Sequence, residues 1–211
     1  MRIRIVTFLA LVTLISCSDG GVLNPDLPDA PRVTAPASLP AVRFSEIHYD
    51  NASTDTGEAI EVSGPAGTDL TGYSIVLYNG SNGTVYDTDA LSGTIPATCG
   101  DRGVVVVNYP VNGIQNGSPD GFALVGPDGV IEFLSYEGAF TAVGGPADGM
   151  GSTDIGVSET TSTPVGHSLQ RTGAGGWNAP AAHSFGVCND AEEPGEIDYV
   201  VVEPAEATIV A

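Results

Sequence analysis

The sequence predicts an all-β sandwich over residues 41–190. Apolar runs in this region are short and rich in β-branched and aromatic residues, and turn-forming residues separate them. The chain holds 28 glycines and 15 prolines in 211 residues without the three-residue period of collagen, which indicates frequent turns. No long segment of this region keeps the apolar period of a helix free of Gly and Pro.

Several segments have the length and composition of strands. Their ranges are 42–49, 58–62, 73–78, 103–108, 121–125 and 129–135. Pro127-Asp128-Gly129 predicts a tight hairpin between the last two, and Asn79-Gly80 with Asn82-Gly83 predicts another. Residues 138–166 are rich in Gly, Thr and Ser, and we expect a long loop or a pair of loops there. Loops of that length often have a functional role.

The N-terminus has the pattern of an export signal over residues 1–16. Arg2 and Arg4 precede an apolar run, residues 5–15, which as a helix would span about 16 Å and could not cross a hydrocarbon core of about 30 Å. Leu14-Ile15-Ser16-Cys17 resembles the lipobox of bacterial lipoproteins, which implies that Cys17 is lipidated. The alternative is an ordinary signal peptide with a cysteine near its cleavage site.

The segments on either side of the predicted domain have the composition of appendages. Residues 17–40 would hold the lipidated cysteine and a Pro-rich, semi-rigid spacer that keeps the domain off the membrane. Residues 191–211 form an acidic tail whose Tyr199-Val-Val-Val202 run could add an edge strand or remain mobile. We therefore expect an exported protein, lipid-anchored at the outer membrane or cell surface of a bacterium rather than in the cytoplasm.

The charge balance is strongly acidic. The chain has 6 Lys+Arg, all of them arginine, against 26 Asp+Glu, for a formal net charge of −20. Such a surface repels phosphate backbones, so we expect no direct binding of nucleic acid. Without lysine the chain has neither a Schiff-base amine nor a P-loop lysine.

A set of short sequence words spans nearly all of residues 42–189. They are Ser45–Asp50, Gly57–Val62, Leu70–Asn79, Asn116–Val125, Phe133–Gly138, Ser152–Gly156, Thr163–Gln170 and Trp177-Asn178. In this order they resemble a bacterial lamin-tail domain. The resemblance implies an immunoglobulin-like sandwich in an exported or membrane-linked accessory module, often found beside nuclease or phosphatase domains. It implies no catalytic residue.

The chain lacks the common catalytic motifs. G-x-S-x-G, H-E-x-x-H, the P-loop and the EF-hand loop are all absent. Spacing alone leaves a site at His48, His167 and His183 open, but positions in the sandwich or on its surface explain these histidines better. We therefore expect no enzyme and no catalytic residue.

Two functional classes remain. The first is a non-catalytic, lipid-anchored binding or scaffolding module whose partner is an envelope protein or a polysaccharide. The second is an exported metal-dependent hydrolase, or an accessory subunit of a phosphodiester-cleaving enzyme. The second class needs cations to stabilise an anionic transition state, and processing would leave only four: Arg32, Arg43, Arg102 and Arg171.

Acidic residues crowd one predicted loop between strands. Asp50, Asp55 and Glu58 could supply oxygen ligands to Ca²⁺, which takes six to eight of them in flexible geometry. The alternative is that aspartates in these segments initiate turns and keep an exported protein soluble. We keep Ca²⁺ as the one cofactor that the sequence suggests.

Cys99 and Cys188 remain as a pair once Cys17 is assigned to the lipid. An even pair in an oxidising compartment predicts a disulfide, which would fasten the end of the domain to its middle. The alternative is two separate thiols, because sequence alone does not show whether the Cα atoms are close enough.

Overall fold

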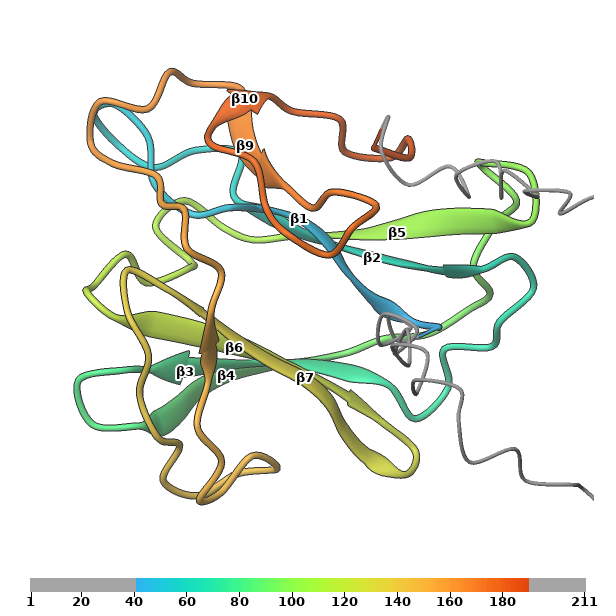
Figure 1. Ribbon diagram of the computed structural model, residues 1–211, viewed down its shortest axis with the longest axis horizontal. Helices are drawn as coiled ribbons and strands as arrows, with labels where there is room; N and C mark the ends of the chain where they lie inside the picture. The colour runs from blue at the N-terminus through green and yellow to red at the C-terminus, as the bar shows by residue number, and fades with distance from the viewer. Residues whose placement is uncertain (1–40, 190–211) are drawn as a thin grey trace, which may run out of the picture. The chain divides into compact units, whose positions relative to one another are not determined.

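Two sheets of five strands each form the fold in the computed structural model, which describes residues 41–189 (Figure 1). The first sheet has the order β10-β9-β1-β2-β5, and the second has the order β4-β3-β6-β7-β8. The strands of the first sheet are β1 (Arg43–His48), β2 (Ala59–Pro65), β5 (Arg102–Asn108), β9 (His167–Gln170) and β10 (Ala181–Ala182). Those of the second are β3 (Ser74–Asn79), β4 (Thr84–Ala90), β6 (Asp120–Gly126), β7 (Gly129–Tyr136) and β8 (Thr153–Asp154).

The predicted all-β sandwich is confirmed over these residues, which contain no helix. No helix among residues 41–189 is therefore available to cross a membrane. Both predicted hairpins are present, β6–β7 at residues 127–128 and β3–β4 at residues 80–83. The signal peptide, the spacer with Cys17 and the acidic tail lie outside the described residues, so these remain predictions.

The main core lies between the two sheets. Its fully buried side chains include Phe44, Ile47, Ile60 and Val62 from the first sheet and Ile75, Leu77, Phe122 and Leu124 from the second. Phe44 and Phe122 meet edge to face across the sheets, with ring centroids 4.6 Å apart. Tyr49, directly after β1, and Tyr136, the last residue of β7, stack with their ring centroids 3.8 Å apart. This stack gives the loops at that end a rigid base.

The long loop after β7 packs more closely than its composition suggests. Ala142 and Ala147 are buried against Val76, Tyr78 and Phe133, on the face of the second sheet away from the main core. The Ala147 N–H donates to the Tyr78 hydroxyl at 3.0 Å. The expected loop is present, interrupted only by the two residues of β8, but its first half serves as a cover for an apolar sheet face.

The predicted disulfide joins Cys99 and Cys188, whose Cα atoms are 6.0 Å apart. Cys188 follows β10 and Cys99 precedes β5, and these strands form opposite edges of the first sheet. Residues 183–189 must therefore cross the outer face of that sheet. We call this segment the strap.

Candidate functional site

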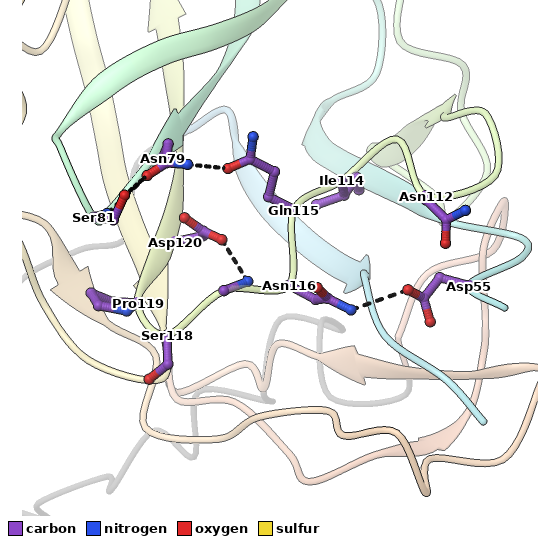
Figure 2. Close-up of a pocket in the computed structure, with 11 residues that line it drawn as sticks. Asp55, Asn79, Ser81, Asn112, Ile114, Gln115, Asn116, Ser118, Pro119 and Asp120 are labelled. Carbon is purple, nitrogen blue, oxygen red and sulfur yellow. Dashed lines mark hydrogen bonds between the residues drawn. The ribbon is translucent and has the colours of Figure 1, made fainter. Parts of the chain in front are cut away.

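A cavity of about 470 Å³ lies between the β3–β4 turn and the loop that precedes β6 (Figure 2). Amide, hydroxyl and carboxylate side chains make up most of its lining: Asp55, Asn79, Ser81, Asn112, Ile114, Gln115, Asn116, Gly117, Ser118, Pro119 and Asp120. Its volume falls in the range of small-ligand pockets, roughly 300–1,000 Å³. We call it the amide cavity.

Asp120 holds the two loops that form the amide cavity. Its carboxylate accepts hydrogen bonds from the Gly80 N–H at 2.8 Å and the Gly117 N–H at 2.7 Å. Burial raises the pKa of Asp120 in spite of these two bonds, which lower it. Asn79 Nδ2 donates to Gln115 Oε1 at 2.6 Å, which ties the same two loops through their side chains (Figure 2).

A second cavity, of about 320 Å³, shares Asn116 with the first. It is lined by Asp50, Asn116, Glu137, Ser158, Glu159, Thr160 and Thr161, and we call it the acidic cavity. Asp50 is 6% exposed, and its Oδ1 has no hydrogen-bond partner among the described residues. The pKa of Asp50 is raised to about 6, first by burial, then by the charge and hydrogen bonding of Asp55, then by the charges of Glu159 and Glu137.

A buried ion pair joins Glu159, which lines the acidic cavity, to His48. His48 Nδ1 lies 2.9 Å from Glu159 Oε1, and the two side chains are 2% and 0% exposed. His48 Nε2 lies 3.2 Å from both Asn51 Oδ1 and the Thr56 carbonyl oxygen. Both ring nitrogens thus face acceptors, a situation that only the imidazolium form satisfies.

The charge state of His48 follows from this geometry. Burial lowers its pKa, but hydrogen bonding and charge from Glu159, with smaller contributions from Asn51 and Thr56, give a net upward shift. Glu159 also accepts from the backbone N–H groups of Tyr49 at 2.6 Å and Asp50 at 3.0 Å. His48 therefore acts as a buried cation rather than as a free base.

The structure brings together two of the three residues suggested for Ca²⁺. Asp50 and Asp55 are neighbours, whereas the Glu58 carboxylate accepts from the Gly113 and Ile114 N–H groups, both at 2.9 Å, and so fixes that turn. Within residues 41–189 no group of three or more His, Cys, Asp or Glu side chains is placed to hold a metal ion. A calcium site made by Asp50, Asp55 and Glu58 remains a prediction, with Glu58 occupied elsewhere.

Glu137 and Glu159 are the residues of this site that sequence reasoning missed. Glu159 bonds to His48 across 111 positions of sequence, and no local pattern signals such a pair. Glu137 follows β7 directly and has a left-handed backbone with φ of 60°, which favours glycine over other residues. The one signal in the sequence that could have pointed to Glu137 was its position just after a predicted strand.

All three histidines line one further cavity of about 240 Å³, together with Val165 and Phe185. Pairing of β9 with β10 brings His167 and His183 together, and His48 enters from the end of β1. Taken singly, the histidines lie where we expected them, His48 buried on β1 and His183 exposed at the surface. Their meeting at one cavity depends on the tertiary fold and was not predicted.

No family model, curated protein or solved structure matches the chain. No hydrogen bond within residues 41–189 joins a Ser, Thr or Cys side chain to a histidine, the arrangement that activates a nucleophile. The two cavities instead offer planar amides, hydroxyls and carboxylates on loops fixed by buried acids.

Proposed function

We propose that this protein is a non-catalytic, lipid-anchored binding or scaffolding module at the bacterial cell envelope. Its β-sandwich would be an immunoglobulin-like, lamin-tail-type domain, held off the membrane by the Pro-rich spacer that follows Cys17. The sequence words across residues 42–189 and the paired sheets support this family. The lipobox-like residues 14–17 and a disulfide support export.

The amide cavity is the observation that supports binding as the function. Side-chain amides both donate and accept, which suits the vicinal hydroxyls of a neutral polysaccharide. Gln115 Oε1 accepts from Asn79, and no hydrogen bond within residues 41–189 uses its Nε2, which can therefore donate to a ligand. The rigid loops around it reduce the entropy lost on binding. We therefore favour an envelope polysaccharide as partner over an envelope protein.

The alternative is an exported metal-dependent hydrolase or an accessory subunit of one. The acidic cavity offers oxygen ligands for a metal. However, none of the described arginines lines either cavity: Arg171 pairs with Glu132, and Arg102 bonds the Ala41 carbonyl and the Ser63 hydroxyl. The described part of the site thus places no arginine where it could stabilise a phosphodiester transition state, and the His48 cation is already paired with Glu159.

Gln115→Ala is expected to weaken polysaccharide binding by roughly three- to tenfold, the value of one hydrogen bond. The Gln115 backbone stays fixed, because its N–H donates to the Tyr86 hydroxyl at 3.0 Å and its carbonyl accepts from Tyr136. The measurement is affinity for a panel of purified envelope polysaccharides, using the chain with Cys17→Ser to remove the lipid. Asn178→Ala, at an exposed asparagine outside both cavities, is the matched control.

Two results would count against this function. One is undiminished binding by Gln115→Ala. The other is failure to retain any polysaccharide together with hydrolysis of a phosphodiester in Ca²⁺, Mg²⁺ or Mn²⁺, which would favour the hydrolase.

Cys17→Ser is expected to abolish fatty-acid labelling and to release the protein from the membrane fraction. A diacylated cysteine carries two chains, enough for stable anchoring where a single chain is marginal. Metabolic labelling followed by membrane fractionation measures both effects, and the Cys99→Ala/Cys188→Ala variant should keep its label. Equal labelling of wild type and Cys17→Ser would contradict the anchor.

A further inference from the structure

Asp50 presents a buried oxygen that the described residues leave unsatisfied. The residue is 6% exposed, lines the acidic cavity, and has no hydrogen-bond partner for Oδ1. Buried carboxylate oxygens are normally hydrogen-bonded or paired with a cation, because losing water without a replacement is unfavourable. A ligand that enters the cavity from solvent would supply the missing interaction.

The charges around Asp50 favour a cation as that ligand. Asp55, Glu137 and Glu159 all act on Asp50 with like charge. His48 is paired with Glu159 of this group, and its ring nitrogens already face Glu159, Asn51 and Thr56. Four carboxylates thus share one imidazolium. A divalent ion would offset the remaining negative charge more completely than a water molecule.

The hydrogen bonds show which oxygens are free to bind an ion. Both oxygens of Glu159 and both oxygens of Asp55 already accept hydrogen bonds. Glu137 uses Oε1 for the Tyr49 hydroxyl, so its second oxygen is free. Asn116 donates through Nδ2 to Asp55 Oδ2 at 3.1 Å, which leaves its amide oxygen free.

We propose that the acidic cavity binds one Ca²⁺ ion through Asp50, the second oxygen of Glu137 and the amide oxygen of Asn116, with water completing the shell. Ca²⁺ accepts such a mixed set of carboxylate, amide and water oxygens in flexible geometry, whereas Mg²⁺ demands a near-ideal octahedron. The set has two carboxylates and an amide, so it differs from the three-acid centre that residues 41–189 lack. Asp55 becomes a positioning residue that orients Asn116.

The proposed ligands come from three loops at one end of the sandwich (Figure 1). Asp50 follows β1, Asn116 precedes β6, and Glu137 follows β7. One ion would therefore join the loops of both sheets beside the amide cavity, with which it shares Asn116. Calcium binding at the acidic cavity does not depend on polysaccharide binding at the amide cavity, so a negative result for one would not contradict the other.

The test uses the Cys17→Ser chain stripped with EDTA and titrated with CaCl₂, by calorimetry and by thermal melts. We expect one ion per chain and a saturable rise in the melting temperature of several degrees, since a ligand that binds only the folded state stabilises it. Asp50→Asn and Glu137→Gln should each weaken Ca²⁺ binding on the order of tenfold or more, because each removes a charged ligand. Asp128→Asn, at an exposed turn aspartate on the β6–β7 hairpin, should bind like wild type.

The melting temperature in EDTA separates lost ligation from lost folding. Asp50→Asn relieves repulsion from three acids, so without Ca²⁺ it should melt at the same temperature as wild type or higher, while its calcium response disappears. A wild-type melt that does not move with CaCl₂, or moves equally with MgCl₂, would overturn the site. So would a full response in Asp50→Asn, or a response abolished by Glu58→Gln and kept by Glu137→Gln.

Discussion

The Cys99→Ala/Cys188→Ala variant is expected to lose about 4 to 5 kcal/mol in the free energy of unfolding. The bond spans a sequence separation of 89 residues. Closing a loop of that length removes much of the conformational entropy of the unfolded chain, and this stabilises the folded state. A loss of that size is a large fraction of the stability of an ordinary domain, about 5–15 kcal/mol.

The strap shows where the loss should appear in the structure. Ser184 Oγ donates to Glu46 at 2.7 Å, and the Gly186 N–H donates to Glu61 at 2.8 Å. Asn189 Nδ2 donates to the Ser45 carbonyl at 2.8 Å. Glu46 and Glu61 are fully buried, whereas Val187 in the strap is 58% exposed. Hydrogen bonds to buried acids, together with the disulfide, therefore hold the strap in place.

Chemical denaturation of the Cys17→Ser chain measures the effect, with and without the two further alanines. Hydrogen exchange should show the Gly186 amide losing its protection first, because its partner Glu61 would be hydrated once the strap lifts. Wild type in reductant should behave as the double variant does. Equal unfolding midpoints, or alkylation of both thiols in the folded, oxidised protein, would contradict the prediction.

The six strands that the sequence predicted all place apolar residues in or against the main core, whereas the four-residue β9 was missed although its Leu169 is buried there. β4 was implied by the predicted hairpin at residues 79–83, but its own composition gave no strand pattern, because this edge strand has an exposed Asp87 and a half-buried Asp89 in place of alternating apolar residues. Its pairing with β3 along the whole strand, rather than its own composition, makes it a strand. β8 and β10 have two residues each, too few to give a pattern.

The candidate site was predictable only in part, for a related reason. Asp50 and Asp55 lie in one loop, so composition alone brought them together. Glu159 reaches the Tyr49 backbone across 110 positions, and this contact exists only after both sheets have packed. Glu58 matched the acidic pattern of the loop, yet its carboxylate accepts hydrogen bonds from two backbone N–H groups of another loop. Local chemistry predicts the type of residue at a site, whereas packing decides which residues meet.

Glu132→Ala is expected to lower the free energy of unfolding by about 3 to 5 kcal/mol, since it leaves a buried charge unpaired. Glu132 Oε1 lies 2.6 Å from Arg171 Nη1, and each side chain is 7% exposed. The second oxygen of Glu132 accepts from the Phe44 N–H at 2.9 Å, while Arg171 donates to the Phe44 carbonyl at 3.1 Å. The ion pair therefore completes the hydrogen bonding of β1 from the opposite sheet.

The need for this pair follows from the lengths of the strands. β9 pairs with β1 only at Glu46 and Ile47, so the backbone of Phe44 has no strand partner on that side. Glu132 on β7 and Arg171 after β9 make the hydrogen bonds to the Phe44 backbone that a longer β9 would have made. The Trp177 ring covers the guanidinium at 5.8 Å, which limits access of water to Arg171.

Urea denaturation at low and high salt would measure the effect of Glu132→Ala, and a buried pair should respond little to salt. Glu132→Ala/Arg171→Met is the matched control, because removing both charges relieves the unpaired cation, and the double variant should regain part of the loss. The Phe44 N–H stays unpaired in both variants, so recovery should be incomplete. A loss below about 1 kcal/mol in the single variant, the value of an exposed pair, would show that water reaches Arg171 and that the sheets do not depend on this contact.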